Sequence, residues 1–244
     1  DIYPNDAYFG SQWSLSRISA PAAWSTSTGS TTITIAILDS GVDSTHPDLA
    51  SKIVPGWNFY DNNSNTTDVY GHGTAVAGTA TAATNNSAGV ASVAWQCRLM
   101  PIRISDLSGN ASTSTIASGL TWAADNGARV ANVSYACSSS STVATAAKYF
   151  QSRGGVVAVS AGNAGTKTTT ADNPYVLTVS ASDASDLLYT WSNRGAEVDL
   201  AAPGLVYTTN RGGGYGGWQG TSFSSPIVAG VAALVLSVNP SLSG

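Results

Sequence analysis

The fold is decided by the stretch Ile33-Thr34-Ile35-Ala36-Ile37-Leu38, which runs directly into Asp39-Ser40-Gly41. The run is short, apolar and rich in β-branched residues, which is typical of a strand buried on both faces. Three further runs share this character: residues 99–104, 129–133 and 156–159. Three longer segments suit helices: residues 73–83, 112–126 and 142–153. This alternation predicts an α/β fold, with a mainly parallel central sheet and helices on both of its faces.

The two ends of the chain carry different signals. The stretch up to Gly29 has aromatics and prolines without a clean period, and we expect it to wrap the surface. After Tyr175 the apolar runs come closer together, which favours hairpins. A last helix is predicted over residues 221–238, because a long apolar stripe ends there near Pro240.

Composition and charge exclude several classes of function. The chain has 244 residues, 10% of them charged, and a formal net charge of −4 with ten Lys and Arg. A nucleic-acid partner needs a basic face, so we expect none. No apolar run approaches the ~20 residues of a membrane span, so we expect no membrane partner. The length fits one domain, which we place over residues 1–244.

The scarce cysteines and histidines narrow the chemistry further. Cys97 and Cys137 could form one bridge or remain two thiols. If the strands that they flank are parallel neighbours, the sulfurs lie at opposite ends of the sheet, whereas a disulfide needs Cα atoms within roughly 7 Å. We therefore favour two thiols, although an oxidising environment would favour a bridge. Any histidine-dependent chemistry must use His46 or His72, the two histidines of the chain.

Three polar residues stand where an open α/β sheet places its sites, at strand ends and helix starts. Asp39 follows the first strand, His72 lies between glycines at a helix start, and Ser222 opens the last helix. A serine hydroxyl becomes nucleophilic when a neighbouring base takes its proton, and that base needs a carboxylate on its other nitrogen. The N-terminus of the last helix would offer backbone N–H groups to a developing oxyanion.

Each of these residues also has a structural interpretation. Asp39 could be a turn or cap residue and Ser222 a plain N-cap, whereas the glycines beside His72 leave its ring accessible. His46 precedes Pro47, which favours extended backbone, and we interpret it as structural. One shared catalytic role explains the placement of all three residues better than three unrelated structural roles. The sequence therefore favours a catalytic group of Asp39, His72 and Ser222.

Three sequence blocks carry a resemblance to a known family. They are Ala36-Ile37-Leu38-Asp39-Ser40-Gly41-Val42, Gly71-His72-Gly73-Thr74-Ala75-Val76-Ala77-Gly78 and Gly220-Thr221-Ser222-Phe223-Ser224-Ser225-Pro226. In this order they resemble the signature blocks of the subtilisin-like serine proteases, and the likeness is greatest to the thermitase branch. The resemblance implies a subtilisin-like three-layer fold and a secreted serine endopeptidase of broad specificity.

The resemblance also implies a role for each residue of the group. Asp39 would orient His72, His72 would act as general base and then acid, and Ser222 would attack the scissile carbonyl to form an acyl-enzyme. Asn163, in Ser160-Ala161-Gly162-Asn163-Ala164-Gly165, matches the family's oxyanion asparagine. A side-chain amide between small residues can direct a donor at the oxyanion, with the Ser222 backbone N–H as the second donor.

The substrate is expected to bind as an extended strand between two edges of the enzyme, as in the family. The matching substrate-binding residues form three segments: Ser108, Gly109 and Asn110; Ser134, Tyr135 and Ala136; and Ala161 with Gly162. The family often has glycines where this chain has Ala136 and Cys137. We expect the added side chains to narrow the pocket for the residue before the scissile bond, favouring small or medium apolar side chains. Asp172, at the matching rim, could instead favour a basic one.

A loop at residues 85–90 resembles the family's strong calcium site. The mapped ligands are all oxygens: the side chains of Asp6, Asp48 and Asn86, and the carbonyls of Ala83, Ala88 and Val90. Six or seven oxygen ligands suit Ca²⁺ far better than Zn²⁺. The alternative is a surface turn beside two solvated aspartates. Bound calcium would stabilise the chain by holding the N-terminal segment to this loop.

A second, weaker calcium site of the thermitase branch is expected to stay empty in this chain. Asn58, Asn63 and Asn65 stand among its positions, and only Asp61 keeps a charge. Fewer charges mean weaker binding. Family members are usually made with a pro-segment, so the resemblance also implies cleavage from a precursor and export. We further expect a monomer.

Three alternatives to a subtilisin-like endopeptidase make different demands on the sequence. A serine esterase of the α/β-hydrolase type would need a Gly-x-Ser-x-Gly elbow and the order serine, acid, histidine, and neither occurs. A catalytically inactive binding module would be expected to have lost one of Asp39, His72 and Ser222. The sedolisin class uses a glutamate as its base, whereas the histidine block is intact here.

Overall fold

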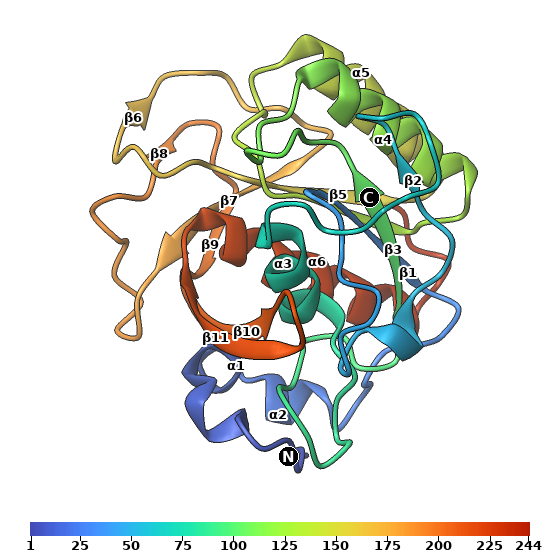
Figure 1. Ribbon diagram of the computed structural model, residues 1–244. Helices are drawn as coiled ribbons and strands as arrows, with labels where there is room; N and C mark the ends of the chain where they lie inside the picture. The colour runs from blue at the N-terminus through green and yellow to red at the C-terminus, as the bar shows by residue number, and fades with distance from the viewer.

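A seven-stranded sheet forms the centre of the molecule (Figure 1). The computed structural model describes all residues 1–244, and the sheet has the order β2-β3-β1-β4-β5-β7-β9, with every neighbouring pair parallel. Its strands are β1 (Thr34–Asp39), β2 (Trp57–Asn58), β3 (Arg98–Arg103), β4 (Val130–Val133), β5 (Val156–Ser160), β7 (Leu177–Ser182) and β9 (Leu200–Pro203). The predicted α/β fold is confirmed, and the four strands expected from the sequence, β3, β1, β4 and β5, are consecutive in the sheet.

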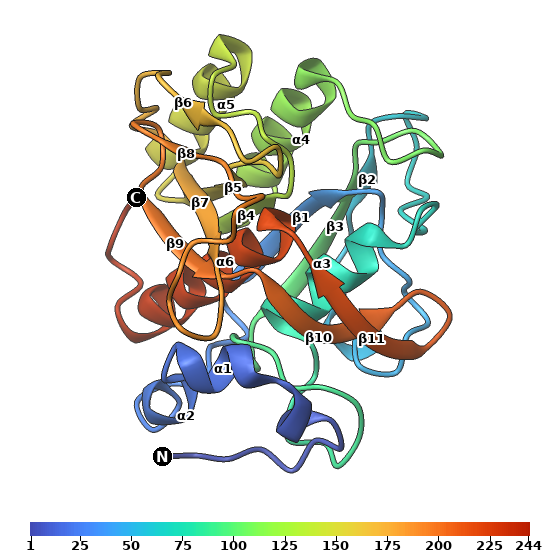
Figure 2. The ribbon, with the colours of Figure 1, turned by 90° about the vertical axis from the view of Figure 1, so that its left-hand side faces the viewer.

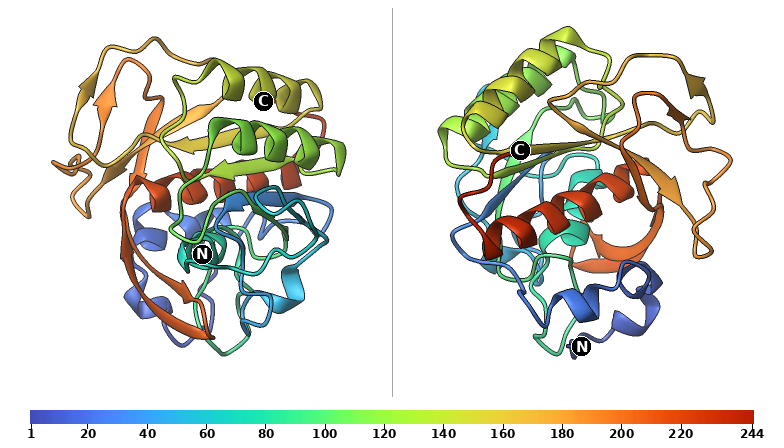
Figure 3. Two further views of the ribbon diagram at one scale, coloured as in Figure 1. Left: turned by 45° about the horizontal axis from the view of Figure 1, so that its top comes forward. Right: turned by 180° about the vertical axis from the view of Figure 1, so that it is seen from behind.

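Helices cover both faces of this sheet (Figures 2 and 3). Two of them, α3 (His72–Thr81) and α6 (Thr221–Val238), pack on one face, whereas α4 (Thr113–Asp125) and α5 (Ser141–Ser152) pack together on the other. Side chains alternate between the faces along a strand, so the cores under both helix layers share each strand. Along β1, Ile35 and Ile37 join the first core, and Ala36 and Leu38 join the second. This explains why the strand is apolar throughout.

The helix ends follow from local capping. The hydroxyls of Ser112 and Ser140 accept hydrogen bonds from backbone N–H groups three residues on, and they cap α4 and α5. Gly127 follows α4 with a φ of +83°, the left-handed conformation expected of a helix-ending glycine. The last helix spans the predicted residues 221–238.

The N-terminal segment contributes more to the core than expected. It contains η1 (Phe9–Ser11), α1 (Trp13–Arg17) and α2 (Ala20–Ala23), which Figure 2 shows below the sheet and its helices. Trp24 is buried, its ring centroid lies 4.6 Å from that of Trp95, and its Nε1 donates to the Val93 carbonyl at 2.9 Å. The segment therefore lies at the surface, as expected, and in addition contributes a side chain to the core. An aromatic residue without a clean period can still bury its ring.

The last third of the chain is only partly made of hairpins. β10 (Leu205–Asn210) and β11 (Gly214–Gln219) form an antiparallel hairpin, which packs beside α3. However, β7 and β9 join the parallel sheet, and β6 (Lys167–Thr168) pairs in parallel with β8 (Arg194–Gly195). The remaining element is η2 (Ala50–Lys52).

The two cysteines are free thiols, as favoured from the sequence. The strands that they flank are not neighbours, because β1 lies between β3 and β4. Cys97 belongs to the hydrophobic core under α3 and α6, whereas Cys137 belongs to the core under α4 and α5. The sheet itself therefore separates the two sulfurs.

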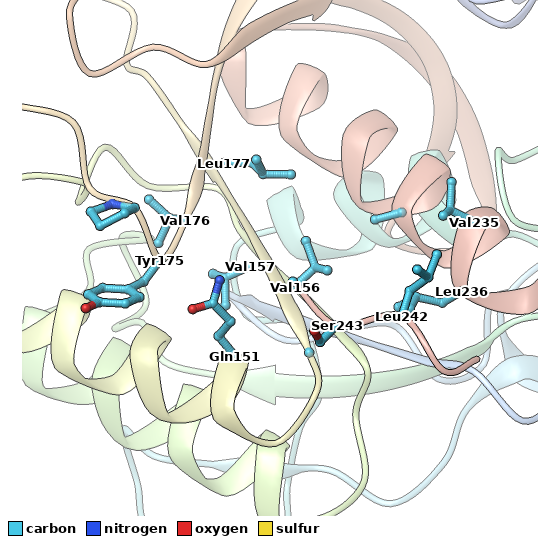
Figure 4. Close-up of a pocket in the computed structure, with 14 residues that line it drawn as sticks. Gln151, Val156, Val157, Tyr175, Val176, Leu177, Val235, Leu236, Leu242 and Ser243 are labelled. Carbon is cyan, nitrogen blue, oxygen red and sulfur yellow. The ribbon is translucent and has the colours of Figure 1, made fainter. Parts of the chain in front are cut away.

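An apolar cavity of about 300 Å³ lies between α6 and the amino ends of β5 and β7 (Figure 4). Val156, Leu177 and Val235 line it, and none of the candidate catalytic residues does. Sites in open α/β sheets form at the carboxyl ends of the strands, so this cavity is at the wrong end for catalysis.

The last helix is more hydrophobic than the sequence analysis allowed for. By length and composition α6 could cross a membrane, with a mean hydropathy of 1.7 over 18 residues. However, 67% of that window is buried inside the fold, which is typical of a core helix. Its apolar character therefore serves packing against the sheet.

Candidate active site

The carboxyl end of β1 and the start of α3 bring Asp39 and His72 together. Asp39 is the last residue of β1, and its side chain is 1% exposed. The Nδ1 atom of His72 lies 2.9 Å and 3.0 Å from the two carboxylate oxygens of Asp39. A carboxylate only accepts hydrogen bonds, so this contact assigns the proton to Nδ1 and leaves Nε2 as a free acceptor. This is the tautomer that a general base needs.

A glycine after His72 permits this close approach. A Cβ atom at Gly73 would lie 2.1 Å from the Gly41 carbonyl oxygen and 3.0 Å from Asp39 Cβ. Both distances are too short, so any other residue here would push α3 away from the end of β1. The glycine of the Gly-His-Gly-Thr block therefore sets the distance between Asp39 and His72.

The imidazole of His72 is held in a mostly apolar, partly covered position. Its ring packs against those of Phe223 and Trp218, with centroids 5.4 Å and 6.2 Å away, and the side chain is 20% exposed. Burial alone would lower the pKa of His72. The negative charge and hydrogen bond of Asp39, followed by the charge of Asp68, outweigh burial, so the pKa of His72 is raised.

Ser222 lies in the first turn of α6, and Pro226 fixes its surroundings. Proline has no N–H, so the carbonyl of Ser222 lacks the usual helical donor four residues on. The hydroxyl of Ser134, just beyond β4, donates to this carbonyl at 2.9 Å instead. The start of α6 is thereby bound to the carboxyl end of β4.

The hydroxyl of Ser222 is not hydrogen-bonded to His72 in this structure. Its Oγ donates to the Ser134 carbonyl, at the long distance of 3.3 Å. The His72 ring nevertheless packs on Phe223, the residue next to Ser222. Rotation about one side-chain bond redirects a serine hydroxyl, and catalytic hydrogen bonds are often loose without substrate. The structure thus forms one of the two predicted contacts of His72 and leaves the other unformed.

Asn163 and the start of α6 present two donors to one space. The Oδ1 atom of Asn163 accepts from the backbone N–H and the hydroxyl of Thr221, both at 2.9 Å, which leaves its Nδ2 as the free end. A Cβ atom at Gly220 would lie 3.4 Å from that Nδ2 and 3.7 Å from the Ser222 backbone nitrogen. Gly220 has a φ of +141°, which excludes most side chains and keeps this space open. The donors fit the predicted oxyanion site.

The two predicted substrate edges differ in what they offer. The backbone N–H and C=O groups of Tyr135 and Ala136 make no hydrogen bond within the chain. By contrast, the N–H groups of Ser108, Gly109 and Asn110 all bond to Asp106. The hydroxyl of Tyr135 donates to the Gly109 carbonyl at 2.9 Å and joins the two segments. One edge is therefore free for an added strand, whereas the N–H groups of the other are already used.

The walls expected to form the specificity pocket are close together. A Cβ atom at Gly162 would lie 3.2 Å from the methyl carbon of Ala136. The side chain of Cys137 points into the core under α4 and α5, and burial raises the pKa of its thiol to about 12. Only Ala136 can therefore narrow the pocket, and the expectation for Cys137 was wrong. Asp172 is exposed in a polar hollow beside residues 138–141.

The predicted calcium ligands gather around the loop at residues 85–90. Asp48 accepts from Asn86 Nδ2 at 2.9 Å and from the Val90 N–H at 3.0 Å. Asp6 accepts from the Asn85 N–H through one oxygen, at 2.8 Å, while its other oxygen is buried without any partner. Burial raises the pKa of Asp6, and the nearby charge of Asp48 adds to this shift.

This arrangement fits a cation once the Asn86 amide is reoriented, because its Oδ1 accepts from the Ala88 N–H at 3.0 Å and its Nδ2 faces Asp48. The carbonyl oxygens of Ala88 and Val90 accept no hydrogen bond from the chain, and that of Ala83 has only a 3.4 Å contact from Asn86 Nδ2. An unpartnered carboxylate oxygen and free carbonyls are the hard oxygen ligands that Ca²⁺ prefers. No three acidic, histidine or cysteine side chains of the chain come together as a metal-binding group. At this loop only two carboxylates are present, so most of the ligands would be neutral oxygens.

The second loop is arranged differently. Asp61 forms an ion pair with Arg103, whose Nη1 lies 2.7 Å from the carboxylate, and Asn58 Nδ2 donates to the same oxygen at 3.2 Å. Asn58 Oδ1 accepts from the backbone N–H groups of Tyr60 and Asp61. An arginine of the chain thus supplies the positive charge at this loop.

His46 has the structural role expected of it. It is fully buried, its Nδ1 accepts from the Asp48 N–H at 3.1 Å, and its Nε2 is 3.0 Å from the Gly214 carbonyl. It fixes the turn before Asp48 against β11.

The sequence did not reveal the role of Ser40 and Asp68, two residues that are hydrogen-bonded next to Asp39 and His72. The hydroxyl of Ser40 donates to Asp68 at 2.7 Å, and Asp68 in turn accepts N–H groups at the start of α3. The available signal was an aspartate four residues before His72 in a stretch rich in turn residues. It could not be told from a helix cap.

A known family pattern covers most of the chain. The pattern of the Subtilase family matches residues 30–244. The chain is 42% identical over 245 residues to thermitase of Thermoactinomyces vulgaris, covering 98% of this chain and 88% of thermitase. It is 41% identical over 239 residues to the thermophilic serine proteinase of Bacillus sp. (strain AK1), covering 96% of this chain but only 60% of that protein.

Solved structures give the same picture of the fold. A protease from Pseudoalteromonas arctica superimposes with a TM-score of 0.85 at 31% identity, covering 97% of this chain and 88% of that one. Sphericase superimposes with a TM-score of 0.81 at 32% identity, covering 88% of this chain and 80% of its own. The predicted resemblance in fold and in sequence, including that to thermitase, is confirmed.

Proposed function

Because the chain belongs to the subtilase family, we propose that it is a serine endopeptidase that acts through Asp39, His72 and Ser222. One observation carries this proposal: the His72 Nδ1 contact with both Asp39 oxygens, at the carboxyl edge of the sheet and beside the helix that bears Ser222. Family membership alone would not require that this contact be intact.

The chemistry follows from the protonation states. With Nδ1 protonated by its contact with Asp39, Nε2 of His72 takes the proton of Ser222 as the hydroxyl attacks the scissile carbonyl. His72 then returns this proton to the leaving amine, which gives an acyl-enzyme, and a water repeats the sequence to release the acid. Asp39 stays ionised and stabilises the imidazolium.

The oxyanion of each tetrahedral intermediate would lie in front of Gly220. Asn163 Nδ2 and the Ser222 N–H both face this space, and the partial positive charge of the α6 N-terminus adds to them. The bonds from Thr221 fix the amide orientation of Asn163 before substrate arrives. Because the donors are preorganised, little reorganisation is needed during the reaction.

The substrate would be an extended protein or peptide segment of broad sequence, added as a strand to Tyr135 and Ala136. The close approach of Ala136 to Gly162 supports a preference for small or medium apolar residues before the scissile bond. A panel of peptides that differ only at that residue measures this preference. Fastest cleavage after Phe or Tyr would contradict the narrow pocket, and fastest cleavage after Lys or Arg would assign the preference to Asp172.

A structural Ca²⁺ ion forms part of the proposal. Asp6, Asp48 and the Asn86 side chain would hold it together with the carbonyls of Ala83, Ala88 and Val90. The ion would neutralise two carboxylates and connect the N-terminal segment to the loop. It has no part in the bond-breaking steps.

We also propose export from the cell, removal of a pro-segment and a monomeric state, all on family membership. Two of the alternatives, a serine esterase and an inactive binding module, lack support from the site. A serine esterase of the α/β-hydrolase type would need a different fold, and an inactive binding module would not need the bond between Asp39 and His72.

A labelling experiment tests the proposed function directly. A phosphonylating serine reagent should label one residue, Ser222, and should abolish casein digestion. Ser222→Ala should remove both labelling and digestion, and a matched Ser225→Ala variant at the next serine but one should keep the label at Ser222. Labelling of another serine, or digestion by Ser222→Ala, would refute the assignment.

A further inference from the structure

Asp68 is a buried carboxylate to which the proposed mechanism gives no task. It lies four residues before His72 and is 3% exposed. Its two oxygens accept five hydrogen bonds of 2.5 to 3.0 Å, from the Ser40 hydroxyl, the N–H groups of Tyr70 and Gly71, and the N–H and hydroxyl of Thr74. None of the three ion pairs of the chain includes Asp68. Hydrogen bonds, without an ion pair, therefore offset the cost of burying this carboxylate.

These donors belong to the two elements that carry Asp39 and His72. Ser40 follows Asp39, and besides donating to Asp68 its hydroxyl accepts from the Gly73 N–H at 3.0 Å. Gly71 is the N-cap of α3, and Gly73 and Thr74 lie beside His72 in its first turn. Asp68 thus connects the end of β1 to the start of α3.

We propose that Asp68 is a positioning residue for the proposed hydrolysis: it fixes Asp39 through Ser40 and His72 through the first turn of α3, and it places a second negative charge near the imidazolium. The inference rests on the proposed function. A plain helix cap would explain the bonds to Thr74, but not the bond to Ser40 or its continuation to Gly73.

The electrostatic part has support beyond the hydrogen bonds. Burial lowers the pKa of His72, Asp39 raises it, and the charge of Asp68 raises it further. The titratable groups facing this region from the surrounding elements are Asp39, Asp43, Asp68, Tyr135 and Arg211. Arg211 is bound to the backbone carbonyl of Asp68, at 3.2 Å, and not to its carboxylate.

Replacing the charge while keeping the shape tests this role. Asp68→Asn leaves an acceptor for Ser40 and removes both the charge and the acceptor for Thr74. We expect the acid limb of the kcat/KM profile to move down by roughly 0.5–1 pH unit. We expect kcat to fall about tenfold with little change in KM, because the substrate does not touch Asp68.

Two further variants keep the test sharp. Asp43→Asn is the matched control, since Asp43 is also buried and accepts bonds from Thr45 and Gly212, yet it does not contribute to the pKa of His72. It should lower the melting temperature without moving the pH profile. Ser40→Ala keeps the charge of Asp68 and breaks the connection to Asp39, so kcat should fall while the acid limb stays in place. This variant also serves if Asp68→Asn does not fold.

The outcomes separate this inference from the proposed function. An active wild type whose pH profile and kcat are unmoved in Asp68→Asn, or unmoved kcat in Ser40→Ala, overturns the positioning role alone. An equal shift of the acid limb in Asp43→Asn overturns it as well. A wild type that digests no casein and takes no label at Ser222 overturns the proposed function and this inference with it.

Discussion

Two clusters of this molecule are each built around two buried carboxylates, but the hydrogen bonding of these carboxylates differs. The histidine cluster comprises Asp39, Ser40, Asp68 and His72, and the loop cluster comprises Asp6, Asp48 and Asn86. In the histidine cluster both carboxylates accept hydrogen bonds through both of their oxygens. In the loop cluster one oxygen of Asp6 is buried with no partner, and nearby carbonyls accept no bond from the chain.

The difference shows what each cluster is arranged to hold. Backbone and hydroxyl donors saturate the first cluster and leave a proton-accepting nitrogen, Nε2 of His72, directed away from Asp39. The second cluster has acceptors in excess, and burial, together with the nearby charge of Asp48, raises the pKa of Asp6. We therefore expect damage to the histidine cluster to change the rate of catalysis, and damage to the loop cluster to change stability.

The largest effect is expected inside the histidine cluster. Asp39→Asn should lower kcat by about 10⁴-fold, a size carried over from the family and from related triads, because the amide favours the wrong tautomer of His72. The melting temperature should change little by comparison. Steady-state kinetics on a peptide substrate measure the loss, and a loss below tenfold would contradict the role of Asp39.

A donor outside both clusters should have a smaller effect on the same rate. Asn163→Ala should lower kcat about 10²–10³-fold with little change in KM, because its Nδ2 acts on the oxyanion and not on the ground-state substrate. Thr221→Val, which removes only the hydroxyl that orients Asn163, should cost less than Asn163→Ala. If KM rises and kcat stays constant, Asn163 binds substrate and does not stabilise the oxyanion.

Removal of calcium should separate the two clusters by stability. At a free ion concentration 100 times its Kd, binding contributes about 2.7 kcal/mol, so a chelator should lower the melting temperature by roughly 5–10 °C. Asp6→Asn should remove this response. Asp61→Asn is the control, because Arg103 already pairs with that loop, and it should keep the response. A melting temperature that changes neither with chelator nor with added calcium would refute the proposed calcium site.

The smallest effect concerns pH. The pKa of His72 is raised, so activity should fall on acidification through a value above the unperturbed 6.5, since protonated His72 cannot accept the serine proton. The sign for stability is opposite: the contribution of protonated His72 is fully present below the unfolded pKa and is lost as pH rises through the folded pKa. Rate profiles and melting temperatures across pH 5 to 9 check both, and an activity optimum near pH 4 would contradict the assignment.

Local patterns in the sequence predicted a large part of this fold. The β-branched run ending at Leu38 and the apolar stripe of the last helix each depend on neighbours a few residues away. For the same reason the three signature blocks identified Asp39, His72 and Ser222. Local patterns did not predict long-range packing. The burial of Trp24 and the pairing of β7 and β9 in the parallel sheet depend on residues far away in the sequence.

The sequence by itself determined which chemical groups are present, their order, and the strand and helix ends on which they stand, because capping, side-chain alternation and glycine positions act over a few residues. Only the tertiary structure decided which side chains are buried and which polar groups already have a hydrogen-bond partner within the chain. It directed Cys137 into the core, used the N–H groups of Ser108 to Asn110 within their own turn, and joined Asp68 to the start of α3. Whether a polar group finds a hydrogen-bond partner and whether a side chain is buried depend on residues far apart in the sequence, which come together only when the chain folds.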